Sequence, residues 1–202
     1  MNLKKIFSDI TNKLDEIDKG REEILSLSRQ MIRNCSIAIK SLHRSEFDIY
    51  EENINEIKLN HENLRKLVHK NPSIFSKYLK TPEQEYVEAI CLFSVIKNKE
   101  LPSPVDYNVD EINYLLGLAD VIGELRRFIL DRIRENKVER IDKILDSMEE
   151  IYTYLFSLDY PKGITQDLRR KTDVARGIIE KTRGDISLTS QINRLNDKLK
   201  KI

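Results

Sequence analysis

Residues 117–127 read Gly-Leu-Ala-Asp-Val-Ile-Gly-Glu-Leu-Arg-Arg, and apolar side chains recur in this stretch every three or four positions. That period is typical of an amphipathic helix. One face of the helix carries Leu118, Val121, Ile122 and Leu125. Asp120 and Glu124 fall on the opposite face, in a polar stripe. The same period runs through most of the chain, and no sustained apolar–polar alternation indicates a strand. The sequence therefore predicts an all-α fold.

Prolines divide this helical pattern into about seven helices. Each stands where the apolar period breaks, at Pro72, Pro82, Pro102, Pro104 and Pro161. The expected helices span 3–44, 46–69, 72–79, 82–99, 109–135, 138–156 and 165–183, with a terminal piece at 188–200 after Gly184. The longest connection, 101–108, carries two prolines and is predicted to be a loop. We expect a single-domain helical bundle over 1–202.

Composition limits the class of protein further. The chain has 202 residues, of which 40% are hydrophobic and 34% charged, as expected of a helical domain with apolar stripes and charged outer faces. The net charge of +1 means that affinity for a nucleic acid must come from a local basic surface. Cys35 and Cys91 lie among apolar neighbours, which predicts buried free thiols. Charged residues interrupt every apolar run, so we expect no signal peptide, no membrane contact and a cytoplasmic location.

Two pairs of carboxylates are the strongest chemical signal. Glu85-x-x-Glu88 and Asp120-x-x-x-Glu124 have spacings that place both members of a pair on one side of a helix. If the two helices pack together, up to four negative charges meet in one place. Such a cluster is costly unless a cation fills it, and Mg²⁺ or Mn²⁺ prefers carboxylate oxygens. The pattern therefore favours a metal-dependent enzyme that acts on phosphodiesters.

Simpler interpretations of these acids remain open. Glu85 lies within an apolar stripe and could pair with an Arg or Lys from another helix. Asp120 and Glu124 could belong to a solvent-facing surface. However, Gly117 and Gly123 flank them, and glycine costs a helix about 1 kcal/mol. Small residues beside acids leave room for a substrate, a metal ion or a close helix.

A basic stripe follows the first helix. Its members are Arg29, Arg33, Ser36, Lys40, His43 and Arg44. Acidic residues are nearly missing from 26–45, whereas neighbouring helices mix both signs. The stripe would extend for roughly 22 Å, enough to follow several nucleotides of a backbone. It predicts contacts with phosphates, and the alternative is an ordinary solvated face.

Other catalytic schemes have less support. None of His43, His61 and His69 has an acid three residues upstream, which excludes the Glu-x-x-His motif of di-iron bundles. The Cys and His residues lack zinc-site spacing. No G-x-S-x-G elbow, Walker loop or dinucleotide-binding fingerprint is present.

Several of these segments resemble a known family. Residues 84–89 and 117–127 are similar to signature segments of the translin superfamily, and 27–29 and 42–44 are similar to its TRAX (translin-associated factor X) branch. The resemblance covers roughly 15–185 and is closer to TRAX than to translin. It implies a seven-helix bundle that assembles into hollow octamers. It also implies cleavage of single-stranded RNA with Mg²⁺ held by acids that face the interior.

The resemblance assigns roles to residues of this chain. The acids that correspond to the catalytic and metal-binding set are Glu85, Glu88, Asp120 and Glu124. We expect Glu85 and Asp120 to be metal ligands. Glu88 and Glu124 would be ligands or the base that activates water. The residues expected to bind nucleic acid are Arg29, Arg33, Lys40, His43 and Arg44.

The expected partners follow from the same resemblance. They are single-stranded RNA, with single-stranded DNA as a further ligand, and other copies of the chain. In the heteromeric complexes of the family, binding and catalysis belong to different chains. Here one chain would have to supply both, which predicts a homo-oligomer. No basic nuclear-targeting run is present near the N-terminus, as expected of a minimal, prokaryotic-type version.

Three other functions remain alternatives. The first is an oligomeric protein that binds single-stranded RNA or DNA without cutting it. The second is an all-α nucleoside-triphosphate pyrophosphohydrolase, although its second motif is normally E-x-x-D. The third is a plain interaction bundle, because an apolar seam suited to helix docking is formed by Leu188, Ile192, Leu195 and Leu199.

Overall fold

The computed structural model describes residues 2–199, and the regular elements in that range are helices. The elements are α1 (Leu3–His43), α2 (Phe47–His69), α3 (Pro72–Phe75), the 3₁₀ helix η1 (Ser76–Tyr78), α4 (Lys80–Lys97), α5 (Glu111–Arg134), α6 (Ile141–Phe156), α7 (Lys162–Thr165) and α8 (Leu168–Leu199). The predicted all-α fold is confirmed. The short α7 was not predicted, and the helix expected at 72–79 is split into α3 and η1.

The predicted break near Gly184 is wrong, because α8 continues through it. Ile179 and Ile186, on either side of this glycine, are both buried against the bundle. A single glycine costs a helix about 1 kcal/mol, which the burial of two isoleucine side chains outweighs. The predicted end at position 200 lies outside the described residues.

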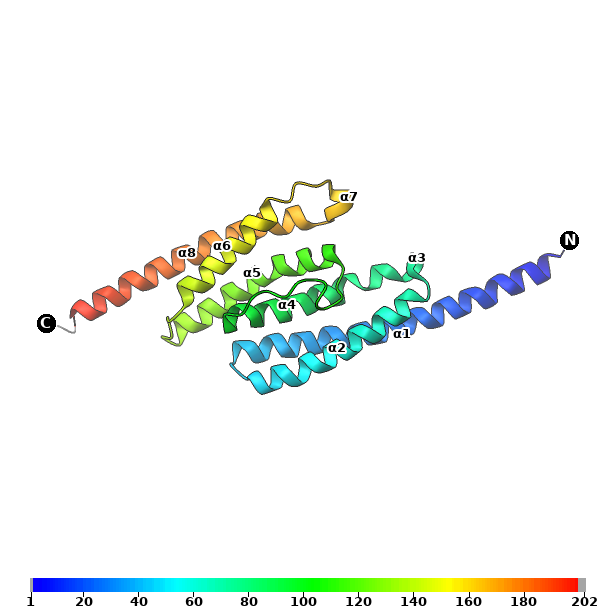
Figure 1. Ribbon diagram of the computed structural model, residues 1–202, viewed down its shortest axis with the longest axis horizontal. Coiled ribbons are helices and arrows are strands. Elements are labelled where there is room, and N and C mark those ends of the chain that lie inside the picture. The colour runs from blue at the N-terminus through cyan, green and yellow to red at the C-terminus, as the bar shows by residue number, and fades with distance from the viewer. Residues whose placement is uncertain (1, 200–202) are drawn as a thin grey trace.

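The long helices form three layers of two (Figure 1). The α1–α2 hairpin packs through α1 on α4, and the α6–α8 pair packs on α5. The α4–α5 pair is therefore the middle layer. Cys35 and Cys91 lie in the core between these layers as buried free thiols, which confirms that prediction.

Helices α4 and α5 run in the same direction. Near the start of α4, a Glu83 carboxylate oxygen accepts hydrogen bonds from Asn113 Nδ2 (2.8 Å) and the backbone amide of Asp110 (3.1 Å), at the start of α5. The connection at 98–110 must therefore return along the length of α4, and it contains the predicted loop at 101–108. Because the helices are parallel, Glu85 and Glu88 follow one another along α4 in the same direction as Asp120 and Glu124 along α5.

Gly117 allows α4 and α5 to cross closely. A Cβ atom at this position would lie 2.7 Å from the Gln84 carbonyl oxygen and 2.8 Å from Val87 Cβ, which are distances that no side chain tolerates. The crossing point falls one residue before Glu85 and three before Asp120. The glycine that the sequence associated with the acids thus brings their two helices together.

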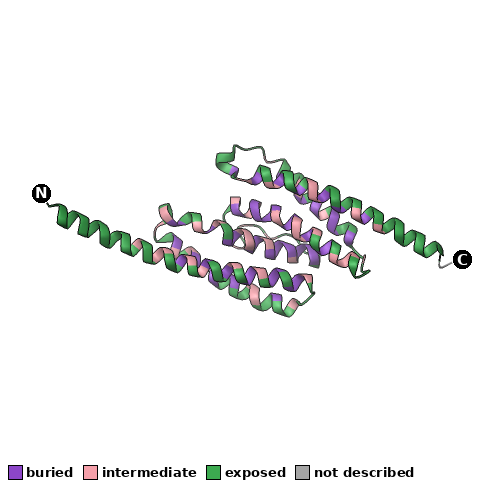
Figure 2. Cartoon of the chain, turned by 180° about the vertical axis from the view of Figure 1, so that it is seen from behind, coloured by how far each residue is buried: buried purple, intermediate pink, exposed green. Residues whose placement is uncertain are grey.

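Two helical arms extend beyond the bundle at opposite ends of the molecule (Figures 1 and 2). The N-terminal arm (3–19) belongs to α1, and the C-terminal arm (187–199) belongs to α8. Their exposed apolar side chains are Leu3, Ile6, Phe7, Ile10 and Leu14, and Leu188, Ile192, Leu195 and Leu199. Even so, no helix within residues 2–199 combines the length and the apolar character needed to cross a membrane.

Candidate active site

The four predicted acids meet on the middle layer. Glu85 and Glu88 project from α4, and Asp120 and Glu124 project from α5, all of them partly buried. Their charges affect one another: burial, followed by the charges of Asp120 and Glu124, raises the pKa of Glu85. We call these four residues the acid cluster.

Glu88 is the most strongly perturbed member of the acid cluster. Burial contributes most, and the charges of Glu85, Glu124 and Asp120 add to it, so that the pKa of Glu88 rises to about 8. In the absence of a bound cation, this side chain holds a proton at neutral pH. The same negative region, after burial, raises the pKa of the Cys35 thiol on α1, which shows that α1 lies beside the cluster.

Each outer layer supplies a basic partner to the α5 acids. His43 Nε2 on α1 lies 2.5 Å from Glu124 Oε2, and this hydrogen bond is the main cause of a lowered Glu124 pKa. From α8, the Lys171 ammonium donates to Asp120 Oδ2. Asp120 and Glu124 are therefore not simply solvent-facing acids.

The α4 acids lack such partners. Among residues 2–199, no ion pair involves Glu85 or Glu88. The interpretation of Glu85 as half of a salt bridge is therefore not what the structure shows. Half of the acid cluster therefore lacks a direct basic partner, and the pKa values of both its acids stay raised.

His43 departs from the predicted basic stripe. Its side chain is only 4% exposed and turns inward to Glu124, with Nδ1 3.8 Å from Asp131 Oδ2. His43 occupies the inner edge of the stripe on α1, where the helix meets α5. The exposed members are Arg29, Arg33, Lys40 and Arg44. Of the predicted stripe, His43 contacts the acid cluster through Glu124, whereas the four exposed residues face solvent on α1.

A hollow of about 240 Å³ lies beside the acid cluster, between α5 and α8. It is lined by Ala119, Asp120, Gly123, Arg170, Lys171, Val174, Ala175 and Ile178. A Cβ atom on Gly123 would meet nothing within 4 Å. The two glycines therefore differ: Gly117 closes a helix contact, and Gly123 borders open space next to the acids.

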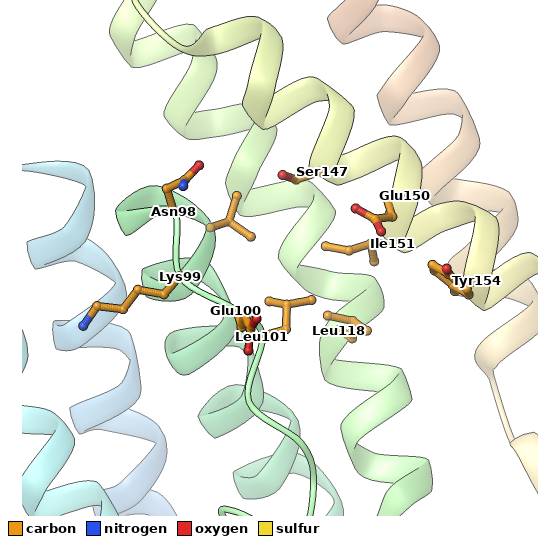
Figure 3. Close-up of a pocket in the computed structure, with 10 residues that line it drawn as sticks. Asn98, Lys99, Glu100, Leu101, Leu118, Ser147, Glu150, Ile151 and Tyr154 are labelled. Atoms are coloured by element: carbon orange, nitrogen blue, oxygen red, sulfur yellow. The ribbon is translucent and has the colours of Figure 1, made fainter.

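A second hollow of about 540 Å³ lies away from the acids (Figure 3). Ser147, Glu150, Ile151 and Tyr154 of α6 face Leu101 and Leu118 across it. Its lining contains no member of the acid cluster. The volume of a hollow therefore does not identify the candidate active site, whereas the grouping of the four carboxylates does.

The side chains of the acid cluster are not arranged as metal ligands in this structure. Within residues 2–199, no three or more His, Cys, Asp or Glu side chains are grouped as they would be around a metal ion. The donor chemistry nevertheless suits a hard divalent cation, since two partly buried carboxylates have no basic partner. Lys171 and His43 hold the other two.

Sequence reasoning missed the residues that act between helices. Lys171 carries no motif and lies 51 positions from Asp120, its partner. Glu83 is fully buried and binds His61 Nε2 (3.0 Å) and Arg65 Nη1 (2.8 Å) of α2. Burial acts to raise the pKa of Glu83, but its hydrogen bonds, led by that from His61, outweigh burial and lower it. Glu83 stands in the polar stretch 81–85, and nothing in this local pattern distinguishes it from Glu85.

The fold and site together define an all-α bundle whose parallel middle helices carry an acid cluster that His43 and Lys171 contact from the outer layers. The sequence profile of the Translin family matches residues 3–183, and the chain belongs to that family, in which it is TRAX-like. An uncharacterised protein of Methanocaldococcus jannaschii is 39% identical over 196 residues, covering 96% of this chain and 86% of the relative. The translin-associated protein X homologue of Schizosaccharomyces pombe is 26% identical over 197 residues, covering 88% of this chain and 84% of the relative.

Solved structures share the whole architecture. The AfC3PO complex with duplex RNA matches with a TM-score of 0.86 and 30% identity, over 94% of this chain and 98% of that one. The apo form of NeC3PO matches with a TM-score of 0.81 and 25% identity, over 91% of this chain and 96% of that one. The layered arrangement is therefore that of the C3PO proteins.

Proposed function

We propose that this protein is an endoribonuclease that binds RNA along α1 and cleaves it at the acid cluster with Mg²⁺ or Mn²⁺. The observation that carries the proposal is the convergence of four carboxylates from α4 and α5 with two of them unpaired. Its family membership and its likeness to a protein described in complex with duplex RNA support RNA as the ligand. Single-stranded RNA is the proposed substrate, and single-stranded DNA a further ligand.

The chain's own residues have distinct tasks in this proposal. Glu85, Glu88, Asp120 and Glu124 would hold the divalent cation. When bound, that cation supplies positive charge that offsets the charge developing on the scissile phosphate. His43 orients Glu124 through the Nε2 hydrogen bond. Glu88 holds a proton in the cation-free protein; a bound cation would lower its pKa, so that the proton would pass to solvent and leave a carboxylate ligand.

The basic residues would hold the RNA backbone. Arg29, Arg33, Lys40 and Arg44 are exposed on α1, the helix whose His43 contacts Glu124. Contacts between such residues and phosphates release counterions, so RNA affinity should fall as salt concentration rises. In this proposal a strand bound along α1 runs past His43, which contacts Glu124, and presents a phosphate to the carboxylates.

The test is a cleavage assay on labelled single-stranded and duplex RNA and DNA, with Mg²⁺, Mn²⁺ or EDTA. The wild-type protein should cut single-stranded RNA only when a divalent cation is present. The Glu85→Gln, Asp120→Asn double variant should bind RNA with unchanged affinity and lose cleavage by at least about 100-fold, a typical loss when charge stabilisation is removed. Undiminished cation-dependent cleavage by the double variant would contradict the proposal.

A second candidate, a binding protein without nuclease activity, is favoured by a different observation. Lys171 and His43 already form hydrogen bonds with two of the four acids, and no three or more His, Cys, Asp or Glu side chains of residues 2–199 are grouped as metal ligands. RNA binding in a gel shift, without cleavage in Mg²⁺ or Mn²⁺, would select this candidate. The pyrophosphohydrolase alternative has less support, because residues 3–183 match the Translin family and 94% of the chain matches the AfC3PO structure.

We also propose that copies of the chain assemble through the two arms. Both arms present apolar side chains to solvent at positions that recur every three or four residues. Exposed apolar surface of this kind favours packing against another helix. The octamer implied by the family resemblance is the expected assembly.

A further inference from the structure

Lys171 is held unusually well for a lysine on a surface helix. Its Nζ atom donates to three acceptors: Asp120 Oδ2, Gln84 Oε1 at 3.1 Å and the Leu116 carbonyl oxygen at 3.3 Å. An ammonium group has three hydrogens, and all three are used. The side chain is only 16% exposed.

These bonds connect three helices at the acid cluster. Lys171 belongs to α8, Gln84 to α4, and Leu116 and Asp120 to α5. Ordering a lysine side chain costs conformational entropy, which the three hydrogen bonds of Lys171 must offset. One of the acceptors is the Leu116 backbone carbonyl, which belongs to the rigid α5 helix.

The positive charge of Lys171 also acts on the two α4 acids. It is the cation that opposes the upward pKa shifts of both Glu85 and Glu88, although neither contacts it. By contrast, the neighbouring Arg170 also lines the hollow beside Asp120 but is 67% exposed and faces Asp167, with 3.8 Å between Nη2 and Oδ2. Lys171 thus pairs with an acid of the cluster, whereas the adjacent Arg170 does not.

We propose that Lys171 is a built-in counter-ion: it holds Asp120 in place in the cation-free protein and competes with a divalent cation for the acid cluster. This inference rests on the proposed function, since it assumes that the cluster binds such a cation. Lys171 is a positioning residue, acting through Asp120. Its charge stabilises the folded protein when no cation is bound, and it lowers the affinity of the cluster for the cation.

The experiment compares Lys171→Met with the matched control Arg170→Met, which removes the same charge from the adjacent position. Mn²⁺ binding is measured by titration calorimetry, and thermal unfolding is followed in EDTA. Lys171→Met should bind Mn²⁺ about tenfold more tightly than the wild type, the effect of removing one nearby like charge. It should also unfold at a lower temperature in EDTA. Arg170→Met should change neither quantity appreciably.

Two further variants separate charge from packing. Lys171→Arg keeps the charge and should retain the wild-type Mn²⁺ affinity to within about threefold. Adding Asp120→Asn to Lys171→Met should restore part of the lost thermal stability, since the unpaired carboxylate is then gone. If Lys171→Met is largely unfolded in EDTA, added Mn²⁺ should refold it. Mn²⁺ that stabilises the wild type but fails to refold this variant would overturn the inference.

The outcomes also separate this inference from the nuclease proposal. Equal Mn²⁺ affinity for the wild type and Lys171→Met, with RNA cleavage by the wild type, overturns only the role of Lys171. Tighter Mn²⁺ binding by Lys171→Met without any RNA cleavage overturns only the nuclease. If neither protein binds Mn²⁺, both are overturned.

Discussion

At the scale of single residues, the chemistry depends on an imbalance of charge within the acid cluster. Asp120 and Glu124 have basic partners, whereas Glu85 and Glu88 have raised pKa values and none. A group that is partly buried with like charges nearby takes up a proton or binds a cation. The cation-free and cation-bound proteins should therefore respond differently to pH.

The raised pKa of Glu88 predicts a pH-dependent stability in EDTA. The folded protein holds this proton up to about pH 8, whereas the unfolded chain releases it near the ordinary glutamate value. Between these pH values the native state binds more protons, so the free energy of unfolding falls as pH rises. Glu88→Gln should remove this fall and be more stable than the wild type by about 1–3 kcal/mol at pH 8.5, with little difference at pH 5. Urea unfolding at both pH values measures it.

The control for this prediction is Glu111→Gln. Glu111 is an exposed acid on α5, outside the acid cluster. Its substitution should leave the pH dependence of unfolding as it is in the wild type. If Glu88→Gln and the wild type lost the same stability between pH 5 and pH 8.5, Glu88 would not hold the extra proton.

Sequence patterns identified the acids but not their partners. The spacings of Glu85, Glu88, Asp120 and Glu124 mark them because each pair shares one helix, and helical spacing is a local property. Lys171 and the inward turn of His43 depend on how α8 and α1 pack on the middle layer. Such contacts between distant segments leave no trace in local periodicity.

At the scale of helices, the acid cluster exists because α4 and α5 run parallel and cross closely. Most of these helices were predictable, since apolar periods and prolines mark where they begin and end. Their direction was not, because it depends on how the connection at 98–110 folds back. The break predicted at Gly184 failed for a similar reason: burial of Ile179 and Ile186 stabilises α8 through tertiary packing.

The two glycines of α5 give opposite predictions. Gly117→Ala places a Cβ 2.7 Å from the Gln84 carbonyl oxygen and forces α4 and α5 apart. We expect a loss of about 1–3 kcal/mol in stability, typical of overpacking, together with weaker Mn²⁺ binding. Gly123→Ala meets nothing within 4 Å and should gain about 0.5–1 kcal/mol, because alanine favours the helix. Urea unfolding of both variants provides the comparison.

Equal effects of the two substitutions would contradict this account of the crossing. A stable Gly117→Ala with unchanged Mn²⁺ affinity would mean that the acids do not depend on the close approach of α4 to α5. Gly123→Ala serves as the matched control, because it makes the same chemical change on the same helix.

At the scale of the whole molecule, the arms predict self-association. Ile10 and Leu195 are exposed apolar residues on the N-terminal and C-terminal arms. Ile10→Asp or Leu195→Asp would place a charge in a helix–helix contact, which costs several kcal/mol. Light scattering after size-exclusion chromatography should show a smaller mass for each variant than for the wild type.

The control on the N-terminal arm is Asn12→Asp, since Asn12 is exposed and lies off the apolar seam. This variant should keep the wild-type mass. A monomeric wild-type protein, or unchanged masses for both seam variants, would contradict assembly through the arms.

The central claim is that carboxylates from α4 and α5 share a divalent cation. Anomalous diffraction from crystals soaked in Mn²⁺ tests it most directly. We predict an anomalous peak within coordination distance of Glu85 and Asp120, with Lys171 moved away from Asp120. The claim is contradicted if crystals at saturating Mn²⁺ show no peak there and the Lys171–Asp120 pair remains intact.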